Sequence, residues 1–233
     1  MKKSLMSIVF IAVLALAGSV AADSLAVNAG AAMGGTNFGL EVSHDNSSRA
    51  YVQDNSPSGE TTFRASFLFN AASVTGHSIN FRQELYRTLG PNPNPGAGSC
   101  SADPAAIIST MRLWLYQTGG SGQNSNIQLW GAGNQCGQRG TTRFPINNGQ
   151  DYRVCIELQT GPTNTGVLAL WVGPTGSACP TSGDPAWATS PMTNSLVTTD
   201  FVRMGTPTNN SFGAGETAIL YFDEYESYRT TSP

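Results

Sequence analysis

The segment Ile107-Ile108-Ser109-Thr110-Met111-Arg112-Leu113-Trp114-Leu115-Tyr116 decides the fold class, because its side chains change character at every second position. Met111, Leu113 and Leu115 are aliphatic, and the residues between them are polar or aromatic. Successive side chains of a β-strand point to opposite faces, whereas a helix repeats every 3.6 residues or so. The segment therefore predicts a strand with one face in an apolar core.

Runs of the same kind recur along the chain, with little helical periodicity between them. They are residues 62–69, 127–130, 152–158, 167–172 and 218–229. Turn-forming segments such as Gly90-Pro91-Asn92-Pro93-Asn94-Pro95-Gly96 separate them, and the chain has 26 Gly and 13 Pro but only 12% charged residues. Eight or more strands without crossover helices predict an all-β protein, an antiparallel two-sheet jelly-roll β-sandwich.

The last run, Leu220-Tyr221-Phe222-Asp223-Glu224-Tyr225-Glu226-Ser227-Tyr228-Arg229, resembles the closing strand of laminin-G-like jelly rolls. These domains belong to the concanavalin A-like lectin/glucanase superfamily. The segments Phe38-Gly39-Leu40-Glu41-Val42 and 63–69 fit the same architecture. The resemblance implies a concanavalin A-like fold, often with glycan or calcium binding, and makes Asp223 a structural acceptor for turn amides.

The N-terminal residues are typical of a secretory signal peptide. Lys2 and Lys3 precede an apolar stretch over 5–18, and small residues follow at 19–22. A membrane anchor would need about 20 apolar residues. We therefore expect residues 1–22 to be removed, leaving 23–233 as a single β-sandwich domain without a membrane span. The protein is expected to be bacterial and secreted, in the periplasm or outside the cell.

The charge balance excludes several classes of partner. Of the 12 basic residues only Lys2 and Lys3 are lysines, so the mature chain has 12 − 2 = 10 basic residues, all arginine, against 15 acidic ones, a net charge of −5. An acidic chain without basic clusters argues against nucleic acid and anionic membranes. The absence of lysine beyond residue 3 excludes Schiff-base catalysis.

Four cysteines predict two disulfides in an exported chain: Cys100, Cys136, Cys155 and Cys179. No two of them have the C-x-x-C spacing of a zinc site. Three pairings are open, and the sequence does not choose among them.

The face opposite the aliphatic residues suggests a function. Aromatic rings beside planar hydrogen-bonding groups suit sugars, because a pyranose has an apolar face to stack and hydroxyls to bond. The predicted binding residues are Trp114, Tyr116, Trp130, Trp171, Arg112, Arg153 and Glu157. The sequence thus favours a secreted, non-catalytic, lectin-like module for extracellular or envelope polysaccharide. In one alternative, loops cover these residues as a second small hydrophobic layer, and a disulfide at Cys155 holds one loop. In another, the protein is a structural or adhesive envelope protein whose aromatic face binds another protein or a second copy of itself.

Catalysis is the third alternative, as a glycoside hydrolase or polysaccharide lyase. Glu224 and Glu226 are two apart on a strand, so they are expected on one face, about 7 Å apart. The segment Arg82-Gln83-Glu84-Leu85 is similar to the first motif of jelly-roll alginate lyases, but the catalytic Gln-x-His of that family is missing, because Thr75-Gly76 precedes His77.

Calcium is the one cofactor that the sequence suggests. Asp45, Asp54 and Glu60 lie in oxygen-rich turns, and oxygen is the ligand that calcium prefers. None of these turns has EF-hand spacing, and Asx turns without metal explain the same residues.

Overall fold

The computed structural model describes residues 23–45, 48–75, 82–117, 124–208 and 217–228. The predicted signal peptide and His77 lie outside these residues. The described chain forms fourteen strands and one short 3₁₀ helix, η1 (Ala29–Ala31). The strands are β1 (Ser24–Asn28), β2 (Gly39–His44), β3 (Ala50–Asp54), β4 (Thr62–Thr75), β5 (Arg82–Pro91), β6 (Ile107–Gln117), β7 (Asn124–Ala132), β8 (Gln138–Gly140), β9 (Phe144–Asn147), β10 (Tyr152–Gln159), β11 (Gly166–Pro174), β12 (Ala188–Met192), β13 (Phe201–Thr206) and β14 (Thr217–Tyr228).

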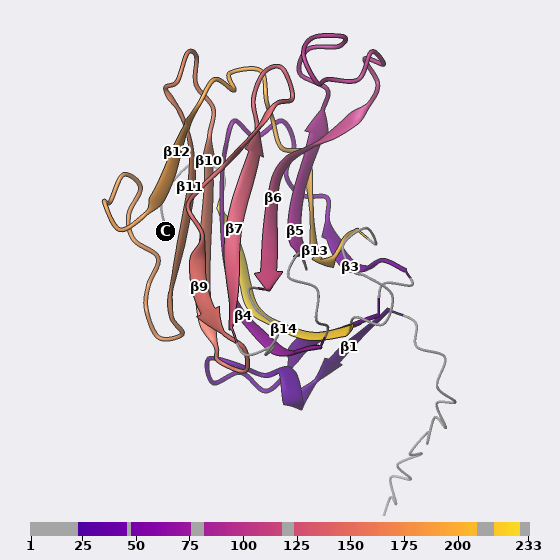
Figure 1. Ribbon diagram of the computed structural model, residues 1–233, viewed down its shortest axis with the longest axis vertical. Helices are drawn as coiled ribbons and strands as arrows, with labels where there is room; N and C mark the ends of the chain where they lie inside the picture. The colour runs from indigo at the N-terminus through magenta and orange to yellow at the C-terminus, as the bar shows by residue number, and fades with distance from the viewer. Residues whose placement is uncertain (1–22, 46–47, 76–81, 118–123, 209–216, 229–233) are drawn as a thin grey trace, which may run out of the picture.

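The strands form two antiparallel sheets. Sheet A has the order β1-β2-β14-β4-β10-β11-β12, and sheet B has the order β3-β13-β5-β6-β7-β8, with β9 also paired to β7. Figure 1 shows β7, β6, β5 and β13 side by side in sheet B. The prediction of an all-β, two-sheet jelly roll is confirmed.

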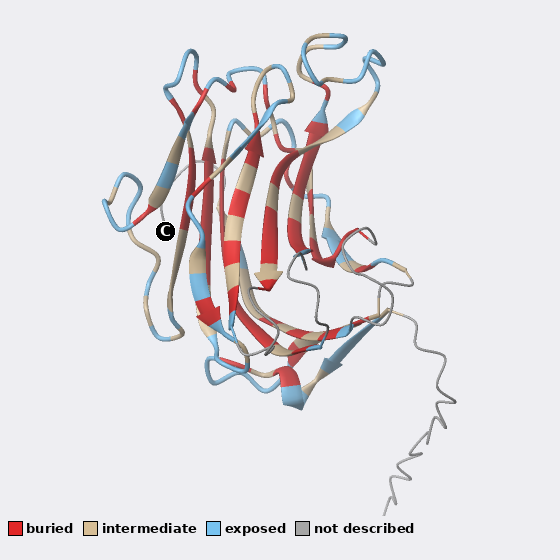
Figure 2. Ribbon diagram, viewed as in Figure 1, coloured by how far each residue is buried: buried red, intermediate tan, exposed pale blue. Residues whose placement is uncertain are grey.

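Alternating side chains build the core between the sheets. Leu113 and Leu115 of β6 and Ile127 of β7 are fully buried on the inner face of sheet B. Phe67 of β4 meets them from sheet A, and its ring stacks on Tyr86 of β5 with the centroids 5.7 Å apart. Figure 2 shows the alternation as bands of buried and partly buried residues along β7. The inner faces of these central strands are thus filled by packing, and their outer faces are the surfaces that a ligand can reach.

The outer face of sheet A is covered. The disulfide Cys155–Cys179 ties the segment after β11 to β10, and Trp187 packs beside it at 5% exposure. The guanidinium of Arg64 lies 5.4 Å from the Trp187 ring and pairs with Glu157, which is 1% exposed. A second small hydrophobic layer therefore covers this face over β10 and β11.

The second disulfide joins Cys100 to Cys136, so the prediction of two disulfides is confirmed and the pairing is settled. Disulfides of this kind are typical of proteins exported to an oxidising compartment. In the described part of the chain, no helix is long and apolar enough to cross a membrane.

Candidate functional site

Three arginines stand side by side on the outer face of sheet B. Arg203 of β13 is in register with Arg87 of β5, and Arg87 is in register with Arg112 of β6. The row continues to Trp130 of β7. Like charges directly opposite each other on neighbouring strands are destabilising. Such a row raises the free energy of the folded protein unless opposite charge lies beside it.

A β-bulge gives the row its counter-charge. The register of β5 on β6 shifts between Glu84 and Tyr86, so Leu85 is an extra residue. Glu84 and Arg87, three positions apart, therefore lie on the same face, and Tyr86 points into the core. The Glu84 carboxylate accepts hydrogen bonds from Nε and Nη2 of Arg87, the latter at 2.7 Å. This buried carboxylate neutralises Arg87.

Arg112 has no such partner in the part of the chain that the structure describes. Its Nε is buried and, among the described residues, makes no hydrogen bond. Burial lowers the pKa of the Arg112 guanidinium, and the charges of Arg87 and Arg82 lower it further, whereas the Glu84 carboxylate raises it. A partly buried cation with an unsatisfied buried donor is stabilised when a carboxylate binds, because the carboxylate supplies both the opposite charge and the acceptor.

The residues beside Arg112 form an aromatic and hydroxyl-bearing surface. Trp130 donates its Nε1–H to the hydroxyl oxygen of Tyr116 at 3.1 Å. The guanidinium of Arg143 lies 4.2 Å from the centroid of the Tyr116 ring, and that of Arg82 lies 5.1 Å from the Trp114 ring. Both distances are within the range of cation–π attraction. The hydroxyl of Tyr116 is therefore held by Trp130, and its ring is held by Arg143.

These side chains line a cleft of about 290 Å³ on sheet B. Its lining residues are Arg82, Glu84, Arg87, Arg112, Trp114, Tyr116, Trp130, Gln138 and Thr208. Three arginines and one glutamate give this arginine cleft a formal charge of 3 − 1 = +2, although the whole chain carries −3. The cleft concentrates positive charge where the sheet is open.

The structure divides the predicted sugar-binding residues between two opposite faces. Arg112, Trp114, Tyr116 and Trp130 share the arginine cleft. Arg153, Glu157 and Trp171 lie on β10 and β11, on the covered face of sheet A. Four of the seven predicted residues are thus brought together, and three are not.

The carboxylates Glu224 and Glu226 also lie on sheet A, away from the cleft. The pairing of β14 with β4 shifts between Asp223 and Glu226, and Glu224 has a φ of 46°. This irregularity breaks the alternation that would place the two side chains as a pair. Glu224 instead pairs with Arg153, and Glu226 accepts a hydrogen bond from Tyr228.

Asp223 accepts hydrogen bonds from the turn after η1. Its Oδ2 receives the backbone N–H of Met33 at 2.8 Å and the hydroxyl of Thr36. This is the structural role that the resemblance to laminin-G-like domains implies for it.

The three calcium candidates lie on separate elements. Asp45 follows β2 and donates its backbone N–H to the Asp23 carboxylate. Asp54 ends β3, and its carboxylate accepts a hydrogen bond from the backbone N–H of Ser56. Glu60 forms an isolated antiparallel β-bridge with Thr199. Among the described residues no group of three or more His, Cys, Asp or Glu is placed to hold a metal ion.

Arg82, Glu84, Arg87 and Arg203 are cleft or row residues that were not among the predicted site residues. Arg82 and Glu84 belong to the segment that is similar to the first motif of alginate lyases, and this similarity was the sequence signal for them. The missing Gln-x-His motif argued against using that signal. The alternation of side chains in β5 does not predict the bulge that turns Arg87 outward.

No protein-family model and no curated protein sequence has a significant match to this chain. Solved structures do resemble it. An endo-β-1,4-glucuronan lyase from the fungus Trichoderma reesei has a TM-score of 0.60 at 14% identity, covering 89% of this chain and 87% of that one. An alginate lyase has a TM-score of 0.54 at 12% identity, covering 84% of this chain and 82% of that one. A marine PL-14 alginate lyase from Aplysia kurodai has a TM-score of 0.53 at 12% identity, covering 88% of this chain and 87% of that one.

These structures overturn one prediction and support another. The prediction of a non-catalytic, lectin-like module is wrong, because the similar structures are polysaccharide lyases. At such low identity the likeness carries the fold and not the substrate or the reaction. The chain therefore has the concanavalin A-like jelly-roll fold that its closing strand resembles.

Proposed function

We propose that the protein is a polysaccharide lyase that cleaves a polymer of uronic acids by β-elimination in the arginine cleft. The observation that carries the proposal is the buried, unpartnered Nε of Arg112 within the row of three arginines. The similar structures are lyases of glucuronan and alginate, and both of these are polymers of uronic acids. A uronate carboxylate supplies the negative charge and acceptor that Arg112 lacks.

The reaction needs a neutralised carboxylate and a group that moves a proton. Abstraction of the proton at C5 leaves negative charge on the adjacent carboxylate, and Arg112 stabilises that charge. The proposed mechanism requires Tyr116 to act as the base: its side-chain oxygen, in the deprotonated form, takes the C5 proton, and the electron pair of the C–H bond forms the C4=C5 double bond. The C4–O4 bond breaks at the same time, and the Tyr116 phenol returns the proton to O4. Tyr116 ends in the state in which it began.

The other cleft residues position the polymer. Trp130 fixes the Tyr116 hydroxyl through the 3.1 Å hydrogen bond from its Nε1–H. Arg82 and Trp114, stacked on one another, offer a cation and an apolar edge to the neighbouring sugar unit. Glu84 keeps Arg87 in place. Each role uses a contact that exists before substrate binds, so the cleft is preorganised.

We further propose that residues 1–22 are a signal peptide and that 23–233 form a single exported domain. The two disulfides support export. Polymers of uronic acids occur outside the cell, where a secreted enzyme meets them.

A product assay tests the lyase activity. Purified protein is incubated with alginate, glucuronan and polygalacturonate, and with a neutral glucan as the control substrate. A lyase releases oligosaccharides with an unsaturated end unit, which are followed by ultraviolet absorbance and by mass spectrometry. We expect such products from at least one uronan and none from the neutral glucan. Saturated reducing ends would indicate hydrolysis, and no product from any uronan would refute the proposal.

A further inference from the structure

A second and larger cavity adjoins the arginine cleft. It encloses about 700 Å³ at the edge where β8 of sheet B meets β12 of sheet A. Most of the polar side chains that line it end in amides, and we therefore name it the amide pocket. The amides are those of Asn94, Asn134, Gln135, Gln138 and Asn164, and Arg139 lies beside them. Gln138 also lines the arginine cleft, so the two cavities meet at β8.

The lining suits sugar hydroxyls. A side-chain amide both donates and accepts hydrogen bonds, as a hydroxyl does. The amides of Gln135, Gln138 and Asn164 make no hydrogen bond with any residue in the described part of the chain, so they can bind a ligand. No carboxylate is among the lining residues and Arg139 adds a positive charge, so an anionic chain is not repelled.

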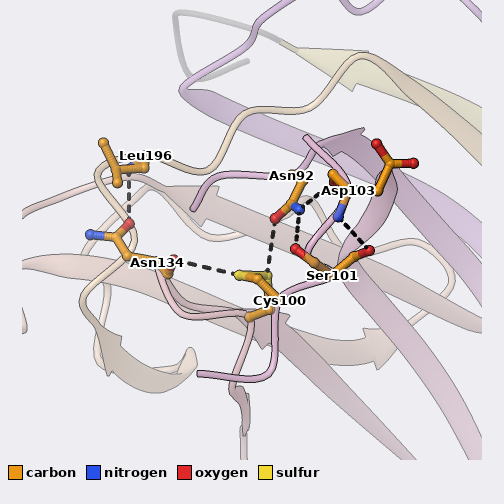
Figure 3. Close-up of a disulfide and its surroundings, with 7 residues drawn as sticks. Asn92, Cys100, Ser101, Asp103, Asn134 and Leu196 are labelled. Carbon is orange, nitrogen blue, oxygen red and sulfur yellow. Dashed lines mark hydrogen bonds between the residues drawn. A yellow bond between two sulfur atoms is a disulfide. The ribbon is translucent and has the colours of Figure 1, made fainter. Parts of the chain in front are cut away.

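The walls of the amide pocket are fixed by covalent and hydrogen bonds. The disulfide Cys100–Cys136 ties the segment between β5 and β6 to the turn between β7 and β8 (Figure 3). The backbone N–H of Asn134 donates to Thr193 O at 2.9 Å, and its Oδ1 accepts from Leu196 N at 2.8 Å, as Figure 3 shows for the latter. A cavity with fixed walls loses little entropy when a ligand binds.

The row of arginines leads towards this pocket. Register pairs carry it from Arg203 through Arg87 and Arg112 to Trp130, and Trp130 is itself paired with Gly140 of β8. Neighbouring strands are about 4.8 Å apart, so the row crosses the sheet at right angles to the strands in steps close to the length of one sugar unit. A polymer that follows the row past β7 reaches Gln138 on the same face of β8. It enters the amide pocket by turning over this edge strand, because Arg139 lies on the other face of β8.

We propose that the amide pocket is a second substrate-binding site, which holds sugar units further along the same uronan chain through their hydroxyls. This inference rests on the proposed lyase function and extends it. The enzyme then binds long chains better than oligosaccharides that fill only the arginine cleft. Arg139 and Gln135 are positioning residues for distant units and take no part in the chemical step.

The test is the dependence of KM on substrate length. Uronate oligosaccharides of increasing length are supplied to the wild-type protein and to the variants Arg139→Ala and Gln135→Ala. Both side chains are exposed, so the variants should fold, and thermal unfolding checks that they do. We expect the wild-type KM to fall about tenfold once the oligosaccharide spans both cavities. Each variant should raise KM about fivefold to tenfold for long substrates only, with kcat unchanged.

The matched control is Arg49→Ala, which removes an exposed arginine at the opposite edge of sheet B, just before β3. It should leave the length dependence intact. An active wild-type protein whose KM does not depend on length, or variants that raise KM equally for short and long substrates, would overturn the amide pocket as a binding site while leaving the lyase activity standing. A wild-type protein inactive on every length would overturn the lyase function, and this inference with it.

Discussion

Stability and anion binding make opposite demands on Arg112. The side chain stands opposite Arg87 on the next strand and keeps a buried Nε–H without a partner among the described residues. A residue selected for stability alone would be neutral here, because opposed like charges and unsatisfied buried donors both raise the free energy of the folded state. The position is explained if a carboxylate binds there.

Replacing Arg112 by Gln should therefore separate the two demands. We expect the cleavage rate to fall about 100-fold or more, since the group that stabilises the developing charge is lost. The free energy of unfolding should stay constant or rise by up to about 1 kcal/mol, because one of the opposed charges is removed. Initial rates and chemical denaturation measure the two effects.

Arg153→Gln is the matched control on the other sheet. Arg153 pairs with Glu224, and its loss should lower stability by roughly 0.2–1 kcal/mol without changing the cleavage rate. If Arg112→Gln lost stability and kept its activity, the guanidinium would be a structural residue and the assignment of the cleft would fail.

His44 gives the protein a pH response outside the cleft. Its Nδ1 lies 2.5 Å from the Asp23 carboxylate, and both side chains are fully buried. Burial lowers the pKa of His44 below its ordinary 6.5, although Asp23, Asp45 and Gln83 oppose the shift. The unfolded chain then takes up the His44 proton first as the pH falls through 6.5, so acidification favours unfolding in this range.

Burial has the opposite effect on Asp23, whose pKa is raised above 3.8. The folded state protonates Asp23 first, so this group offsets part of the loss at lower pH. We predict that the midpoint temperature of unfolding of the wild-type protein decreases as the pH falls below 6.5, and that His44→Gln has a flatter profile. Equal slopes in the two proteins would show that His44 does not control the response.

At the scale of the strand, alternation was enough to predict β6, β7, β10 and β11, because each has one aliphatic face. It was not enough to predict which sheet each joins. Trp114 and Trp171 have the same relation to their aliphatic neighbours, yet β6 lies in sheet B and β11 in sheet A. Long-range pairing decides that choice.

Irregular strands are the second reason why the sequence did not predict the whole site. In β5 the extra residue Leu85 turns Arg87 outward beside Glu84. In β14 the shift at Glu224 separates the carboxylates that strict alternation would pair. A bulge depends on the partner strand and is not visible in the period of one strand, so the cleft was only half predictable.

The disulfide Cys155–Cys179 belongs to the covered face of sheet A, and its contribution should be to stability alone. It closes a loop between residues 24 apart, which should stabilise the fold by about 3 kcal/mol. We predict that the double variant Cys155→Ala/Cys179→Ala unfolds more easily but cleaves the uronan at the wild-type rate. Chemical denaturation and initial rates test this. Loss of activity in folded protein would indicate that sheet A also contacts substrate.

At the scale of the whole molecule, the two sheets have different tasks. Sheet A is covered over β10 and β11 by the Trp187 layer. Sheet B carries the arginine cleft on its outer face, in a chain with a net charge of −3. Under the proposed function, this charge distribution attracts a polyanionic substrate to one face of the molecule.

The most direct test of this account compares wild-type protein with Tyr116→Phe and Tyr152→Phe. Both changes remove a tyrosine hydroxyl that makes hydrogen bonds, Tyr116 in the cleft and Tyr152 on sheet A. The measurement is the initial rate of unsaturated product formation from a uronan that the wild-type protein cleaves. We predict that Tyr116→Phe loses about 100-fold or more in rate while still binding the polymer, and that Tyr152→Phe keeps the wild-type rate. A folded Tyr116→Phe variant with the wild-type rate would contradict the account.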